Sequence, residues 1–269
     1  MADLLPLAAL LVLTGLLAGG VAGLLGVGGG IVIVPVLFHV FTQMGIDPAV
    51  RMHLAVGTSL ATIVVTAWRS VRSHHARGAV DVSLLRAWVA PVLVGTLLGS
   101  AAARFASSAA LGAVFASVAL CVAVHLAFSR ESWRIGDHLP GGAGGAALGG
   151  GIGFFSVLMG LGGGTLGVPV LTLFGVPIHR AVGTAAGLGL VIGVPGAVSF
   201  AASGWGVPGL PQGSLGYVNL LGFALIVPAT WLAAPWGARL AHVAPQRTLR
   251  RIFALFLAFT SLRMFAGLG

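Results

Sequence analysis

The sequence predicts an all-α polytopic membrane protein made of two inverted-topology repeats, each a glycine-broken helical hairpin followed by three transmembrane helices. Three observations support this class. The 269 residues are 58% hydrophobic and only 7% charged, with a mean hydropathy of +1.07, whereas soluble domains carry about 25% charged residues. A glycine-rich phrase occurs twice, and the arginines are distributed unequally between the two halves.

The repeated phrase is the clearest internal signal. Gly26–Leu37 and Gly160–Leu171 are identical at eight of twelve positions, including four glycines and one proline. Each copy is followed by a second matching phrase, His53–Ser59 and His179–Ala185. Repetition at equivalent places in two halves is the signature of internal structural repeats.

The apolar runs predict five helices in each half, in the same order. In the first half they are Leu4–Leu25, Ile31–Thr42, Val50–Ala67, Val82–Ala103 and Ala109–Phe128; in the second they are Gly141–Met159, Thr165–Phe174, Arg180–Ala202, Gly216–Arg239 and Thr248–Ala266. A span needs about 20 residues, so the second helix of each half is too short to cross. The polar stretch between them predicts a first membrane repeat at 1–128, a cytoplasmic linker at 129–140 and a second membrane repeat at 141–269.

Arginine placement predicts how the halves are oriented. The loop predicted at Arg69–Arg77 is basic, but its counterpart, Ser203–Ser214, carries no charge. The next connection reverses this bias, with Arg104 alone in the first half and four arginines between 239 and 251 in the second. Only opposite orientations place both basic loops on one side, which the positive-inside rule makes cytoplasmic. Each hairpin then returns to its starting side and both termini are periplasmic; a fully crossing hairpin, with ten spans in all, is the alternative.

Composition also excludes several functions. The net charge of +9 lies between apolar runs, where arginines orient spans and meet lipid headgroups, so we expect the lipid bilayer and no nucleic acid as a partner. No His, Cys, Asp or Glu residues have metal-ligand spacing, and no nucleophile is paired with a base. We therefore expect no metal, no cofactor and no enzyme activity. The sequence is consistent with a monomer but leaves the oligomeric state open.

The two glycine runs are the predicted binding site. Broken helices in corresponding places of inverted halves mark substrate sites, and helix N-termini favour anions. Pro35 and Pro169 follow each run and free a further carbonyl group. Tight helix packing is the alternative role for these glycines. The predicted substrate-binding residues are Gly28, Gly29, Gly30, Ile31, Gly57, Thr58, Ser59, Gly162, Gly163, Gly164, Thr165, Gly183 and Thr184.

Four basic residues flank the second phrase of each repeat. Arg51, His53, His179 and Arg180 are candidates for gating, or for attracting an anion or a proton; snorkelling at span ends is the alternative. None of the five acids falls within a predicted span. A coupled proton would therefore be carried by a histidine or by the substrate itself rather than by a carboxylate relay.

These residues resemble a known family. The motifs GVGGGIVIVPVL, AVGTSLATI, SHHARGAV, MGLGGGTLGVPVL, HRAVGTAAG and GSLGYVNL together are similar to those of the sulfite exporter TauE/SafE (TSUP) family. The resemblance implies a multi-pass carrier in the bacterial inner membrane for sulfur-containing anions such as sulfite and organosulfonates. Ala185 stands where the first repeat has Ser59, so an equivalent hydroxyl contact is absent there. An anion channel, or an importer of another small anion, is the alternative.

Overall fold

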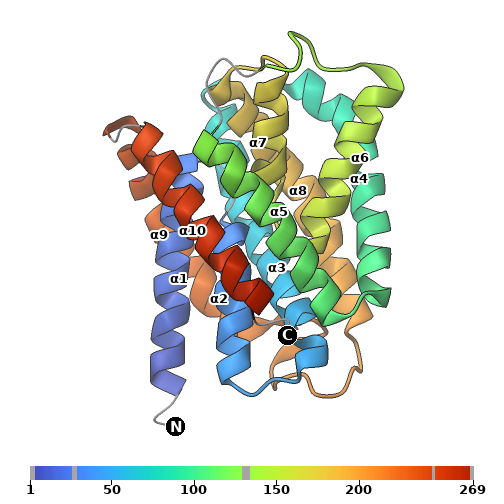
Figure 1. Cartoon of the computed structure of the whole chain (residues 1–269), viewed down its shortest axis with the longest axis vertical. Coiled ribbons are helices and arrows are strands. Elements are labelled where there is room, and N and C mark those ends of the chain that lie inside the picture. The colour runs from blue at the N-terminus through green and yellow to red at the C-terminus, as the bar shows by residue number, and fades with distance from the viewer. Residues whose placement is uncertain (1–3, 26–28, 129–133, 244–245, 267–269) are drawn as a thin grey trace.

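The computed structural model describes residues 4–25, 29–128, 134–243 and 246–266. These residues form an almost entirely helical bundle (Figure 1). The helices are α1 Leu4–Leu25, α2 Gly30–Gln43, α3 Pro48–His75, α4 Val82–Phe105, α5 Ser108–Phe128, α6 Gly142–Leu158, α7 Gly163–Leu173, α8 Ile178–Ser203, α9 Leu220–Val243 and α10 Gln246–Ala266.

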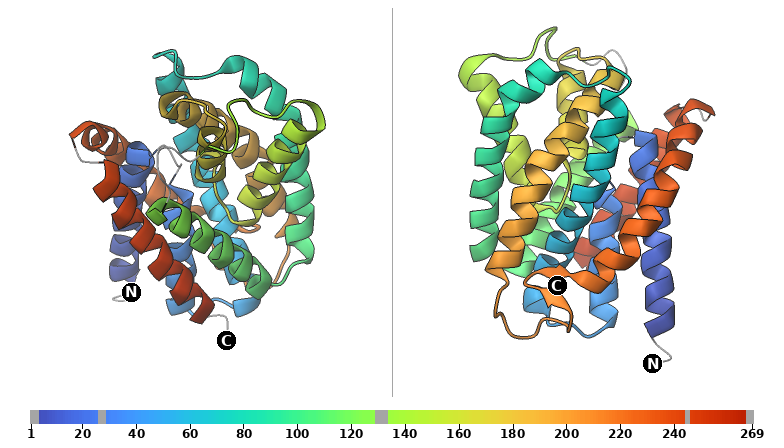
Figure 2. Two further views of the ribbon diagram at one scale, coloured as in Figure 1. Left: turned by 45° about the horizontal axis from the view of Figure 1, so that its top comes forward. Right: turned by 180° about the vertical axis from the view of Figure 1, so that it is seen from behind.

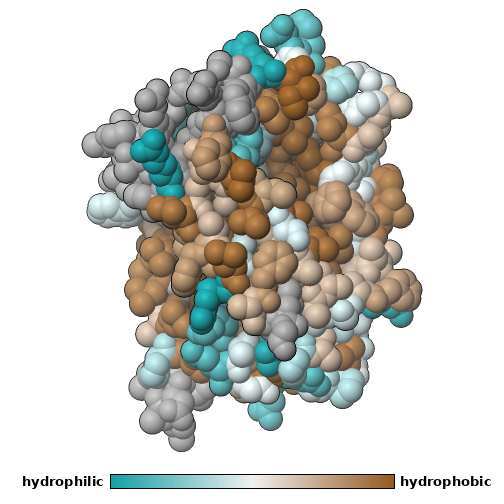
Figure 3. All heavy atoms as spheres, in the orientation of Figure 1, coloured by the Kyte–Doolittle hydropathy of each residue, from teal (hydrophilic) through white to brown (hydrophobic). Residues whose placement is uncertain are grey.

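The predicted all-α membrane fold is confirmed. Among the described residues, six helices are long and apolar enough to span a membrane, whereas α2, α6, α7 and the Ala254–Ala266 part of α10 are shorter apolar helices. On the face shown in Figure 3, apolar side chains dominate the middle and polar ones gather toward the two ends. That distribution suits a protein surrounded by lipid, because large exposed apolar surfaces mark contact with a membrane or a partner.

Two predicted boundaries were wrong. The basic stretch beginning at Arg69 is helical as far as His75, because α3 continues past the apolar run; three basic residues in its last turn favour the negative end of the helix dipole. The helix predicted from Gly216 begins instead at Leu220. The residues before it form a short hairpin of β1 (Ser214–Leu215) and β2 (Val218–Asn219), in which Gly216 has φ 53°.

The hairpin of each half packs mainly against the other half. Helix α1 packs along α9, and α6 packs along α4 (Figures 1 and 2). Helices α3 and α8 pack together between these pairs, and α5 packs on α10. Each hairpin therefore has its most extensive contact with the other half. Helices α1 and α6 run in opposite directions, both described chain ends lie on one side, and the 134–141 segment lies on the other.

Matching glycines make these exchanged contacts possible. A Cβ atom at Gly19 of α1 would lie 2.6 Å from the carbonyl oxygen of Thr230 in α9. Gly153 of α6 holds the aligned position, and a Cβ there would clash with the carbonyl of Val92 in α4. Because small residues let membrane helices approach at backbone distance, tight packing is the role of these two glycines.

We predict that Gly153→Ala destabilises the protein while Gly151→Ala does not. The first methyl group would meet the α4 backbone, whereas nothing lies within 4 Å of the second. Overpacking of this kind costs about 1–3 kcal/mol. Thermal unfolding in detergent, followed by size-exclusion chromatography, should show a lower midpoint for Gly153→Ala only. Equal midpoints for both variants would contradict the packing role.

Candidate anion site at the glycine turns

The structure brings the two glycine runs into contact. Helix α2 begins after Gly29, which has φ 72°, and α7 begins after a turn in which Gly160 has φ 67°. A Cβ atom at Gly30 would lie 2.7 Å from the carbonyl oxygen of Gly160. Both turns need glycine, because positive φ strains other residues and the close approach leaves no room for a side chain. Gly28 lies outside the described residues.

Ser59 ties α3 to the turn of the opposite half. Its hydroxyl donates a 2.7 Å hydrogen bond to the Gly160 carbonyl, and the side chain is fully buried. A carbonyl released where a helix breaks inside a membrane costs several kcal/mol if it stays unpaired. Ser59 therefore supplies a partner that the broken hairpin needs. Its counterpart Ala185 cannot donate, so the repeats differ at this position.

Ile63 occupies the space between the two helix starts. A Cβ at Gly30 would lie 2.9 Å from its Cδ1 atom, and one at Gly162 would lie 3.3 Å from its Cγ2 atom. The side chain is fully buried. No motif in the sequence singles out Ile63, although this residue follows Ser59 by four positions and therefore shares its helix face.

Two helix N-termini thus converge from different halves of the chain. The first N–H groups of a helix have no partner within that helix, and the helix dipole adds partial positive charge there. The groups concerned belong to Gly30 and Ile31 in α2 and to Gly163 and Gly164 in α7, with Thr165 buried in the same turn. Such an arrangement can hold a small anion without any charged side chain.

Gly163 also has a packing role. A Cβ there would lie 2.6 Å from Cβ of Leu188 and 2.7 Å from the carbonyl oxygen of Ala185. The binding and packing explanations therefore apply to neighbouring glycines in one run, and a substitution at Gly163 would not separate them.

The prolines remain inside their helices. Pro35 lies within α2, which has 14 residues, and Pro169 lies within α7, which has 11. Near Pro169 the Thr172 hydroxyl donates to the carbonyls of Val168 and Pro169 at 2.9 and 3.0 Å. Threonines within helices commonly make such bonds to carbonyls three and four residues earlier.

The hydroxyl groups of Thr58 and Thr184 bind loops. The Thr58 hydroxyl accepts the backbone N–H of Asn219 at 2.8 Å, and that of Thr184 accepts the N–H of Asp81 at 3.0 Å. Gly57 and Gly183 lie directly against the carbonyls of Tyr217 and Ala79 in the same two loops.

The four basic candidates have different surroundings. His53 is 5% exposed, with Nε2 3.1 Å from the Ala103 carbonyl and its ring stacked on Tyr217 at 4.9 Å. Arg51 donates to the carbonyl of Ile46. The other two are exposed at the start of α8, where Arg180 pairs with Asp81 at 3.4 Å. The matching histidines, His53 and His179, therefore do not share an environment.

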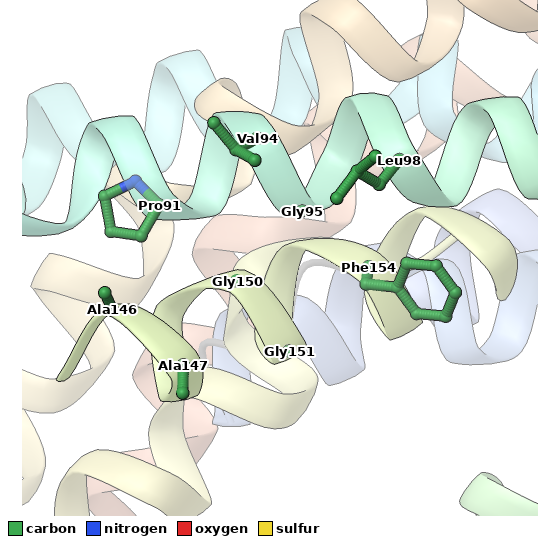
Figure 4. A pocket seen from close by; sticks show the side chains of 9 residues that line it. All are labelled: Pro91, Val94, Gly95, Leu98, Ala146, Ala147, Gly150, Gly151 and Phe154. Carbon is green, nitrogen blue, oxygen red and sulfur yellow. The ribbon is translucent and has the colours of Figure 1, made fainter. Parts of the chain in front are cut away.

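A surface depression of about 440 Å³ lies elsewhere, between α4 and α6 (Figure 4). Its lining is apolar and consists of Pro91, Val94, Gly95, Leu98, Ala146, Ala147, Gly150, Gly151 and Phe154. Without a polar side chain this depression does not suit an anion. Within the described ranges, no three His, Cys, Asp or Glu side chains are grouped closely enough to bind a metal ion.

Comparison with known proteins identifies the family. The family model described as sulfite exporter TauE/SafE matches residues 11–264. A probable membrane transporter protein of Haemophilus influenzae is 34% identical over 266 residues, which are 95% of this chain and 97% of the relative. Another from Methanocaldococcus jannaschii is 27% identical over 87% of this chain and 84% of its own length. The probable membrane transporter YunE of Bacillus subtilis is 27% identical, with coverages of 92% and 93%.

No solved structure matches the chain. The family model and the Haemophilus relative both extend over nearly the whole sequence, and the relatives' names agree with the multi-pass helical fold described above. The protein is therefore a membrane protein that belongs to the sulfite exporter TauE/SafE family of transporters.

Proposed function

We propose that the protein is a secondary transporter, in the exporting direction, for a small sulfur-containing anion such as sulfite or an organosulfonate. The proposed site lies between the starts of α2 and α7, and comprises the turns at 29–31 and 162–165 together with Ser59. The observation that carries the proposal is the contact between the two turns. They are so close that a Cβ atom added to Gly30 would lie only 2.7 Å from the carbonyl oxygen of Gly160. The description of the family supports the choice of sulfite.

The arrangement favours a carrier over an open pore. Ile63 fills the space between the helix starts, and the surrounding residues Gly30, Ile31 and Ser59 are buried. An anion could enter only if one half moved relative to the other, which is how inverted-repeat carriers alternate their access. A channel would need a wetted passage through the same residues.

The proposal also includes location and coupling. The basic end of α3 and the basic start of α8 lie on the side of the linker. By the positive-inside rule we infer that this side is cytoplasmic and that both termini are periplasmic, in a bacterial inner membrane. We retain the division into repeats at 1–128 and 141–269 as part of this topology. A coupled proton would be carried by a histidine or by the anion.

The first test is uptake of labelled sulfite into proteoliposomes, with and without a pH gradient. We expect saturable uptake that sulfite on the opposite side accelerates, with competition from thiosulfate or a small organosulfonate. Large single-channel currents without this acceleration would favour the channel. If none of these anions were transported, the sulfur-anion assignment would be wrong.

Ser59→Ala should lower the transport rate by about 5- to 150-fold, because losing a buried hydrogen-bond partner costs about 1–3 kcal/mol at the turn. The matched control is Ser203→Ala, since the Ser203 hydroxyl donates to the carbonyl of Ser199 within its own helix. Initial rates in proteoliposomes containing equal amounts of folded protein check this. Similar rates in both variants would remove Ser59 from the site.

Ile63 provides a second test. Ile63→Val keeps a branched side chain and should retain transport, whereas Ile63→Phe should abolish it by overfilling the gap between the helix starts. Monodisperse elution of both variants from a size-exclusion column would establish that they fold. Full activity of Ile63→Phe would show that the anion does not pass this point.

A further inference from the structure

Two loops occupy equivalent places on opposite sides of the molecule. The linker-side loop, Gly78–Asp81, precedes α4, and the terminus-side loop, Gly216–Asn219, precedes α9. Asp81 caps α4 by accepting the N–H of Leu84 at 3.0 Å, and Asn219 caps α9 by accepting the N–H of Gly222 at 2.7 Å. Both caps therefore have the same geometry.

The loops are also attached in the same way. Asp81 donates its backbone N–H to Thr184 of α8, and Asn219 donates its own to Thr58 of α3. In each case the preceding glycine of the helix lies against a loop carbonyl. The next helix residue then reaches the glycine hairpins, since Ser59 bonds to Gly160 and the Ala185 carbonyl lies beside Gly163. Each loop is thus connected, through one helix segment, to the proposed anion site.

The two attachments differ in charge. Nη2 of Arg180 lies 3.4 Å from Oδ2 of Asp81 on the linker side. At the aligned positions the terminus side has the neutral Asn219 and, in place of Arg180, Leu54. There, His53 stacks on Tyr217 instead.

Asp81 is a carboxylate at neutral pH. The Ser83 hydroxyl, the Leu84 N–H and the Arg180 guanidinium hold the pKa of Asp81 below its ordinary value. The charged form is the one these groups stabilise, so the contact with Arg180 is an ion pair under physiological conditions.

We propose that the two loops are the opposing gates of the transport path, and that the linker-side gate alone is latched by an ion pair, Arg180–Asp81. This proposal rests on the alternating-access function proposed above. It adds that the two access states differ in stability. The latch favours the state closed on the linker side, and ionic strength weakens it because the Arg180 side chain is 57% exposed. The terminus-side gate has no equivalent dependence on salt.

The test is hydrogen exchange of the full-length protein in detergent, followed by mass spectrometry of peptides that cover 78–84 and 214–222. Asp81→Asn removes the ion pair but keeps the capping oxygen, so the helix start is retained. We expect exchange at 78–84 to rise by about two- to fivefold, the factor for a partly exposed ion pair. Exchange at 214–222 should fall, because opening one gate of a carrier closes the other.

Four comparisons make the test specific. Arg180→Gln should reproduce the effect, and the double variant should add nothing to it, because both changes remove one interaction. High salt should have the same effect on the unmodified protein. Asn219→Asp is the matched control on the other side and should leave exchange at 78–84 unchanged.

Unchanged exchange at 78–84 in Asp81→Asn would overturn the latch. A rise at both peptides would show general destabilisation, and an unchanged 214–222 peptide would show that the loops are not coupled; either result would also overturn the proposal. These measurements need no transported anion. A failure of sulfite uptake would therefore refute the substrate assignment, but it would not test whether the two loops act as gates.

Discussion

A polypeptide that breaks its helices inside a membrane must provide partners for every backbone group that it frees. Lipid offers neither donors nor acceptors, so irregular backbone survives only where the protein surrounds it. The hydrogen bond from Ser59 to the Gly160 carbonyl meets this demand at one break. Burial of the broken turns then determines much of the architecture, because α3 and α8 must pack around them and the hairpins must reach across to the other half.

Glycine has two distinct uses in this arrangement. At Gly29 and Gly160 it permits the positive φ that turns the chain, and at Gly30 it lets one turn touch the other. At Gly19 and Gly153 it lets one helix lie against the carbonyls of another. The first use produces a polar feature, two helix starts in the interior, and the second produces the apolar contacts that hold those starts in place. The same residue type thus supports both the candidate site and its scaffold.

Much of the fold could be predicted from the sequence, because long apolar runs and repeated glycines are local signals. The ten helices were expected within a few residues, except where basic residues extended α3 and where a β-hairpin delayed α9. The partners of the hydroxyl groups could not be predicted. The hydroxyls of Thr58 and Thr184 accept N–H groups of two loops, and their spacing in the sequence fixes a helix face but not the loop that packs on it. The pairing of Asp81 with Arg180 was hidden for the same reason, since the two residues belong to different halves.

The exchanged hairpins have a consequence for biosynthesis. Helix α1 leaves the ribosome long before its principal partner, α9, because seven helices separate them in the described chain. Contacts between such distant segments form late, and exposed segments remain vulnerable to misassembly until then. During synthesis the close-packing surface around Gly19 must therefore be covered by lipid or by an insertion factor. A chain truncated before α9 should insert its remaining helices, α1 to α8, but α1 would lack its packing partner.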